Sequence, residues 1–388
     1  MGSNKNNSLI RNAPILLIIA VWLPQIIYRA LAENSPFESL ATDTYFALFM
    51  ATFSYLLGAY AGKLSLSEFK SNATIKTYAN NKGGFSRRYI FLRLLLIILA
   101  VTYFLRYLGI PMLQGADVSN MRDMALSEWS EGGYFIKLFA IGVNSLACTI
   151  VLFASFEYEL KRKVNYLLLI LFIMVCIASY ARTMLLIGLF IFVIRLASDL
   201  EHPIKTIVMS VLGFIAIFLF LGLTAKDNSD LNETALNILK LHAEVYFFGG
   251  VAGLNNYIIN SDPQYQSILT IPRFVQDAIP IGTAMPPQYF DFVNTPVPLN
   301  VFTAIFPPLH DFGYLGVVGL FFVYGLTTAI ACKKFVGNHS YFWQVCAGFL
   351  LYASAMSIFD DQFIRGLPVL LIFVAVSLIF KSIYRYIR

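Results

Sequence analysis

Basic residues near the ends of apolar segments are the first side chains in this sequence that suggest a ligand. The arginine guanidinium group carries five N–H donors in a planar fork, which matches two phosphate oxygens at once. Several such groups converging from separate segments are able to hold a pyrophosphate. The alternative for each is an anchor near lipid headgroups or an ion pair with a neighbouring acid. On the face assigned below to the outside, the basic residues are Arg29, Arg106, Arg122, Lys137, Arg182, Lys226, Lys240, Arg273 and Arg365.

Three side chains are candidates for a general base, a group that takes a proton from a reacting hydroxyl. They are Glu244, His310 and Asp311. For Glu244 the alternative is a solvated helix face, and for Asp311 it is the cap of the helix that follows. The sequence leaves these interpretations open.

Aromatic residues are frequent between positions 246 and 292 and could stack on a ligand. For most of them an aromatic belt at the membrane interface is the better explanation. Asp360 and Asp361 lie close to Arg365, and a simple ion pair that closes an outer loop accounts for them. We therefore leave the two aspartates out of the chemistry. The aromatic residues are Tyr246, Phe247, Tyr257, Tyr265, Tyr289, Phe290 and Phe292.

Signatures of the familiar metal and nucleotide chemistries are absent from the sequence. The four cysteines show no CxxC spacing and no histidine beside them, so we expect neither a metal site nor a disulfide framework. No HExxH, P-loop, GxSxG or Gly-rich dinucleotide motif occurs. We therefore expect no cofactor.

Composition indicates an all-α, polytopic membrane protein. Of 388 residues, 58% are hydrophobic and 13% are charged, outside the usual range of soluble domains. Apolar runs of roughly 17 to 25 residues are the length that crosses the bilayer as helices. We expect one integral membrane domain over 1–388 with about ten or eleven spans. The ten that we place lie at 13–31, 43–62, 89–109, 134–156, 164–180, 183–198, 204–224, 312–331, 341–359 and 366–386.

Lysine and arginine gather in alternate loops, and this pattern orients the spans. Such loops are cytoplasmic by the positive-inside rule, which places both termini in the cytoplasm. One long kinked helix over 164–198 would reverse every later span, and the basic loops argue against it. The net charge of +6 is explained by these loops, so we expect no nucleic-acid partner.

The segment 225–311 is too long for an ordinary connection, and loops of that length are usually functional or disordered. We interpret it as a large periplasmic loop. Residues 233–260 carry a helical apolar pattern, which we expect to break at Gly249-Gly250 and to form a re-entrant or interfacial helix that caps a cavity. The centres of the predicted spans carry no ionisable residue, which argues against an ion-coupled carrier.

Several stretches, in this order and spacing between the spans, resemble the Wzy-type O-antigen polymerases, which join oligosaccharide repeat units. Together with the span layout they cover most of the chain. They are Gly109-Ile110-Pro111 with Arg122 before Gly132-Gly133, the turn from Ser179 to Met184, Tyr246-Phe247-Phe248-Gly249-Gly250, Asn300-Val301-Phe302-Thr303, and His310-Asp311-Phe312-Gly313-Tyr314-Leu315-Gly316.

The resemblance implies a metal-independent glycosyltransferase at the periplasmic face of a bacterial inner membrane. Its substrate would be an undecaprenyl-pyrophosphate-linked oligosaccharide, and its partners would be membrane lipids, a Wzz-type chain-length regulator and a Wzx-type flippase. On this interpretation Arg122, Arg182, Arg273 and then Arg365 stabilise the leaving pyrophosphate, Glu244, His310 or Asp311 is the base, and Tyr246 contacts sugar. The alternatives are an O-antigen ligase that transfers glycan to lipid A core and a flippase for lipid-linked sugar.

Overall fold

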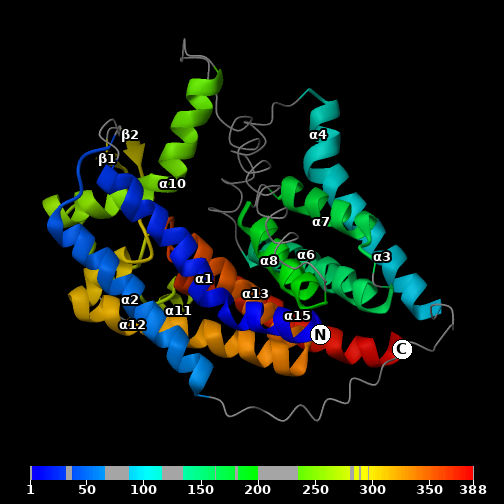
Figure 1. The fold of residues 1–388 in the computed structure, drawn as a ribbon. Coiled ribbons are helices and arrows are strands. Elements are labelled where there is room, and N and C mark those ends of the chain that lie inside the picture. The colour runs from blue at the N-terminus through cyan, green and yellow to red at the C-terminus, as the bar shows by residue number, and fades with distance from the viewer. Residues whose placement is uncertain are drawn as a thin grey trace.

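The protein is an all-α, multi-pass membrane protein whose helices lie side by side in a bundle (Figure 1). The computed structural model describes residues 2–31, 37–65, 87–115, 134–161, 163–179, 182–199, 235–279, 284–287, 290–295 and 297–387. The helices are α1 (Gly2–Leu31), α2 (Thr42–Leu64), α3 (Arg87–Phe104), the π-helical turn η1 (Leu105–Gly109), α4 (Ile110–Leu113), α6 (Tyr134–Lys161), α7 (Tyr166–Ala178), α8 (Arg182–Asp199), α10 (Ala235–Asn260), α11 (Arg273–Ala278), α12 (Phe306–Asn338), α13 (Tyr341–Met356), α14 (Gln362–Arg365) and α15 (Leu367–Ile387). The strands β1 (Val293–Thr295) and β2 (Val297–Leu299) form an antiparallel hairpin.

Among the described residues, five helices are long and apolar enough to cross a bilayer. They are Asn7–Tyr28, Thr42–Leu64, Arg87–Leu113, Ile141–Lys161 and Phe306–Asn338, with shorter apolar helices at Tyr166–Ala178, Thr183–Ser198 and Leu367–Ile383. Each coincides with a span that the sequence predicts. The predicted span 204–224 lies outside the described residues, so the total of ten stays a prediction.

The α7–α8 pair is a hairpin rather than one long kinked helix. The ring of Phe172 on α7 fills the space in which a side chain at Gly188 on α8 would lie. In one continuous helix these residues would be about 24 Å apart along the axis. The prediction of two short spans joined by a turn is therefore confirmed.

Helices α2 and α12 pack in parallel along their whole length and form the centre of one side of the bundle. Gly58 and Gly325 allow this close approach, because a Cβ at Gly58 would collide with the carbonyl of Phe322 and one at Gly325 with the carbonyl of Tyr55. At one end Phe46 on α2 meets Tyr314 on α12, edge to face at 5.2 Å.

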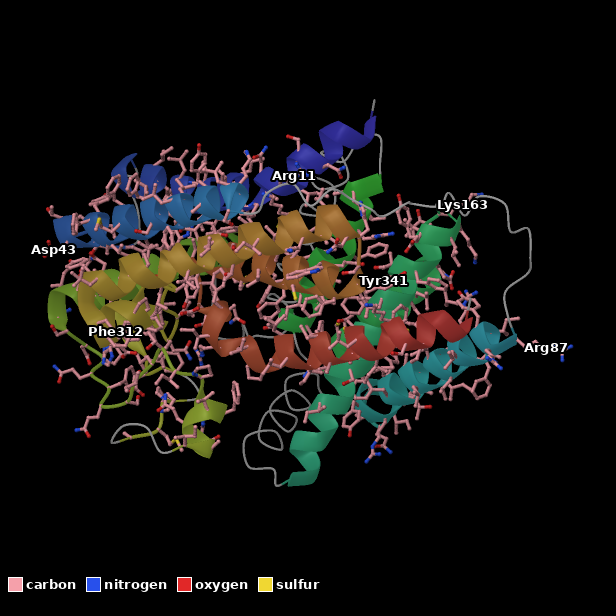
Figure 2. All side chains as sticks on the ribbon, turned by 90° about the horizontal axis from the view of Figure 1, so that it is seen from below. Arg11, Asp43, Arg87, Lys163, Phe312 and Tyr341 are labelled. Atoms are coloured by element: carbon pink, nitrogen blue, oxygen red, sulfur yellow. The ribbon has the colours of Figure 1, made fainter. Side chains whose placement is uncertain are left out.

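The bundle has two ends, which we name for use below. We call the end at which α2 and α12 begin, beside Asp43 and Phe312, the site end (Figure 2). The opposite end carries Arg87 and Lys163, and we call it the basic end.

Helix α10 continues through Gly249-Gly250 as a single element, so the predicted break is wrong. The glycines serve close packing instead. A Cβ at Gly250 would collide with the carbonyl of Ile358, and one at Gly253 would lie 2.5 Å from the carbonyl oxygen of Val301. The segment after α10 therefore folds back against the bundle at the site end.

Candidate functional site

His310 and Asp311 form a hydrogen-bonded pair near the start of α12. His310 Nδ1 lies 2.8 Å from Asp311 Oδ1, and the side chains are 14% and 3% exposed. Two residues later Gly313 has a positive φ of 63°, which interrupts the helical geometry of α12. The pair therefore lies on the short helical turn before this kink.

Asp311 also anchors the loop that follows α10. Its Oδ1 accepts a hydrogen bond from Leu269 N at 3.1 Å, and its Oδ2 accepts from both N and Oγ1 of Thr270 at 2.7 Å. The alternative role of Asp311 as a helix cap is not seen among the described residues, because its carboxylate bonds go to Leu269, Thr270 and His310. Asp311 instead joins α12 to a segment about forty residues earlier in the chain.

A cluster of rings surrounds His310, and we call it the aromatic platform: Tyr257, Tyr265, Phe290, Phe302 and Phe306. The platform places His310 5.9 Å from Phe306, 6.1 Å from Tyr257 and 6.2 Å from Tyr265, measured between ring centroids. The three phenylalanines are buried, whereas the two tyrosines are partly exposed beside the imidazole. The phenylalanines thus support the site, and the tyrosines offer it polar and aromatic surface.

Arg365 lies against another ring of the same platform. Its guanidinium carbon is 4.8 Å from the centroid of Phe290, within the range of a cation–π contact. Its Nη1 donates to Asp360 Oδ1 at 3.1 Å, so the predicted ion pair is confirmed for Asp360. Phe290 is in turn 5.1 Å from Phe306, so a cation and an imidazole share one support.

Asp361 has a different role from the predicted ion pair. It is fully buried, caps α14 by accepting from Phe363 N and Ile364 N, and accepts from the hydroxyl of Tyr324 at 2.9 Å. Asp361 therefore fixes the turn that presents Arg365.

The turn between α13 and α15 is recessed below the site end. Helix α13 has 16 residues, or about 24 Å, which is short for a hydrocarbon layer of about 30 Å. Tyr324, which holds Asp361, lies ten residues or about 15 Å along α12 from Tyr314. Trp22, whose Nε1 donates to Ser357 Oγ at 3.0 Å, lies nine residues or about 13 Å before the end of α1.

The view in Figure 2 agrees, since α15, in red, begins part-way along α12 and not beside Phe312. Ala304 N reaches down to this turn and donates to Ser357 O at 2.8 Å. The sequence placed Asp360, Asp361 and Arg365 on an outer loop, and the structure places them on a turn about 13 to 15 Å along α1 and α12 from the site end. The side chains of Asp360 and Arg365 are 18% and 31% exposed. Within a bilayer, charged side chains are stable only where they face protein or water rather than lipid.

The beginning of α8 lies close to the same turn. The hydroxyl of Tyr352, on α13, is buried, and its polar neighbours are the side chain of Thr183 and the carboxylate of Asp360. Thr183 follows Arg182, whose side chain lies outside the described residues, so the backbone of Arg182 is next to the recessed turn.

The remaining predicted site residues are less closely connected to His310 and Arg365. Arg273 begins α11 and is exposed, three residues after the Thr270 anchor. Glu244 is half-buried on α10, about 9 Å along the axis from Gly250. Arg122 and the side chain of Tyr246 lie outside the described residues.

Sequence reasoning missed the supporting residues of the site. Phe306 and Tyr352 were not singled out, because a buried aromatic residue in an apolar segment carries no local signal of function. Phe302 lies in one of the stretches that carry the family resemblance. Its place shortly before His310 in the chain was the one sequence feature that pointed to it. Within the described residues no cluster of three or more metal-ligand side chains occurs.

Comparisons with protein-family models, curated proteins and solved structures found no match to this chain.

Proposed function

We propose that this protein is a glycosyltransferase that polymerises polyprenyl-pyrophosphate-linked oligosaccharide repeat units. The observation that carries the proposal is the aromatic platform with a carboxylate-bound imidazole against one part and a guanidinium against another. Sugar transfer from a lipid pyrophosphate needs a base for the acceptor hydroxyl and a cation for the leaving group. His310 and Arg365 supply these two groups on one support.

The reaction can be written with these residues in place. The acceptor hydroxyl attacks the anomeric carbon of the donor sugar as His310 Nε2 takes the hydroxyl proton. The bond between the anomeric carbon and the pyrophosphate oxygen breaks, and the pyrophosphate leaves with the electron pair. Arg365, with Arg182 from the adjacent start of α8, neutralises the charge that develops on it.

The depth of Arg365 suits a donor that is anchored in lipid. A pyrophosphate on a polyprenyl chain stays near the membrane surface, while the glycan needs water. In this proposal the recessed Arg365 binds the pyrophosphate, and the partly exposed tyrosines beside His310 contact the glycan. In this proposal the site end faces the periplasm of a bacterial inner membrane, both termini are cytoplasmic, and a flippase and a chain-length regulator act as partners.

The direct test is reconstitution of the purified protein in vesicles with lipid-linked repeat units. A ladder of products is expected with and without a chelator, and His310→Ala should reduce its rate on the order of 10²- to 10⁴-fold. The matched control is His339→Asn, a histidine substitution at the basic end, where asparagine tolerates the left-handed backbone of this residue. Full ladders from His310→Ala would refute the proposal, and transfer only to a lipid A core acceptor would indicate a ligase.

A further inference from the structure

We propose that Asp311 is a positioning residue that fixes His310 as a base with its accepting nitrogen at Nε2, and that it ties this base to the loop carrying Arg273. This inference rests on the proposed function for its kinetic consequences. Its structural part stands on hydrogen bonds alone.

The carboxylate of Asp311 is saturated, which removes it as a base. Leu269 N and His310 Nδ1 lie at Oδ1, and the amide and hydroxyl of Thr270 lie at Oδ2. With its side chain only 3% exposed, no lone pair remains directed toward a substrate hydroxyl. An acceptor so fully occupied holds its neighbours and takes no proton.

The same bonds determine the tautomer of His310. An ionised carboxylate has no proton to donate, so the hydrogen between Nδ1 and Oδ1 belongs to the imidazole. The lone pair of the neutral ring is then on Nε2, which makes no hydrogen bond to any described residue. Without Asp311 either nitrogen could carry the proton, and part of the protein would present N–H instead of a base.

Asp311 also couples the base to the loop 261–279. Within the loop, Gln276 is buried on α11 and donates to Ile268 O at 2.7 Å and Ile271 O at 2.9 Å, which closes the turn around Arg273. Arg273 lies between Thr270, which Asp311 holds, and Gln276. The carboxylate of Asp311 therefore fixes the position of the His310 imidazole and of the loop backbone that carries Arg273.

The test is Asp311→Asn, with Thr270→Val as the matched control. The asparagine removes the charge at His310, whereas the valine removes a loop hydrogen bond and leaves the His310 contact intact. We expect the turnover number of Asp311→Asn to fall on the order of 10²-fold or more, with a smaller change in KM, and Thr270→Val to stay within a few-fold of wild type.

A double-variant cycle separates positioning from a merely structural role. The double variant His310→Ala/Asp311→Asn should be no slower than His310→Ala alone. Additive losses in the double variant would overturn the inference.

Nitrogen NMR of histidine-labelled protein in micelles gives an answer that needs no activity. A protonated Nδ1 and a bare Nε2 on His310 in the wild type support the inference, and the opposite tautomer overturns it even if Asp311→Asn does not fold. The expected tautomer in a protein that makes no ladder would refute the proposed function and leave the positioning role of Asp311 in place.

Discussion

Two buried carboxylates, one at each end of the bundle, make equally complete sets of contacts but have different partners. At the basic end Glu157 accepts from the hydroxyl of Tyr89, from Asn165 Nδ2 at 2.6 Å and from Lys161 Nζ at 3.2 Å, and Arg93 Nε lies 3.6 Å away. At the site end Asp311 holds two backbone amides, a hydroxyl and an imidazole. Both satisfy the requirement that a buried charge be paired.

The two carboxylates differ in the chemistry that their hydrogen-bond partners can perform. The partners of Glu157 join α3, α6 and the start of α7, and each is a donor that offers no base. Nearby, Glu159 joins Arg195 on α8 and Tyr341 on α13 in the same manner. His310 at Asp311 differs, because the second nitrogen of its neutral imidazole can act as a base. The comparison teaches that a saturated carboxylate stabilises the basic end and prepares chemistry at the site end.

The largest expected effect on stability is that of Glu157→Ala. It leaves the buried hydroxyl of Tyr89 without its acceptor and the part-exposed charges of Arg93 and Lys161 without their shared partner, so we expect a loss of about 3 kcal/mol. Denaturant unfolding in micelles measures this loss, and activity per folded molecule should stay at the wild-type level.

Lys161→Ala is the control for this prediction. The Lys161 side chain is 40% exposed and Glu157 keeps its other partners without it, so the loss should be about 1 kcal/mol or less. A fully stable Glu157→Ala protein with no activity would contradict the division between the two ends.

At the site end, Arg365→Ala should reduce activity more than it reduces stability, the opposite of Glu157→Ala. Asp360 loses its partner and the platform loses the cation over Phe290, so we expect about 1–3 kcal/mol of lost stability and a larger loss of activity. Arg365→Lys keeps the charge but not the planar group that stacks on the ring, so its activity should be intermediate. The measurements are denaturant unfolding and the rate of ladder formation.

Arg93→Lys at the basic end is the matched control, and it should leave the rate unchanged. An Arg365→Ala protein that polymerises at the wild-type rate would show that the recessed ion pair has a role in stability alone.

The sequence predicted the features that depend on local pattern. Apolar length predicted the long helices, the basic loops predicted the α7–α8 hairpin, and proximity in the chain predicted the pairing of Asp360 with Arg365. It could not predict the anchor from Asp311 to Thr270 or the bond from Ala304 to Ser357. Both join distant segments, and no periodicity or spacing reports such contacts.

The depth of the recessed turn escaped prediction for a related reason. Hydropathy marks where an apolar run ends but not whether that end reaches the surface. The depth of residues 357–366 follows from the length of α13 together with the contacts of Tyr324 and Trp22.

The smallest expected effect is that of Tyr265→Phe, which tests whether the platform acts through its rings or its hydroxyls. The hydroxyl of Tyr265 accepts from Asp291 N at 2.8 Å, and its loss should cost about 1 kcal/mol at neutral pH. Burial raises the pKa of Tyr265 from its ordinary value of 10.0 to about 12. The stabilising effect of the neutral hydroxyl is therefore complete below pH 10 and disappears as the pH rises toward 12.

The stability difference between Tyr265→Phe and wild type should accordingly narrow over this range in denaturant unfolding. Because the ring that packs 6.2 Å from His310 is retained, activity at neutral pH should stay within a few-fold of wild type. A loss comparable to that of His310→Ala would instead make the Tyr265 hydroxyl part of the chemistry, and the aromatic platform would then be more than a support. A stability difference that does not change with pH would show that burial does not raise the pKa of the Tyr265 hydroxyl.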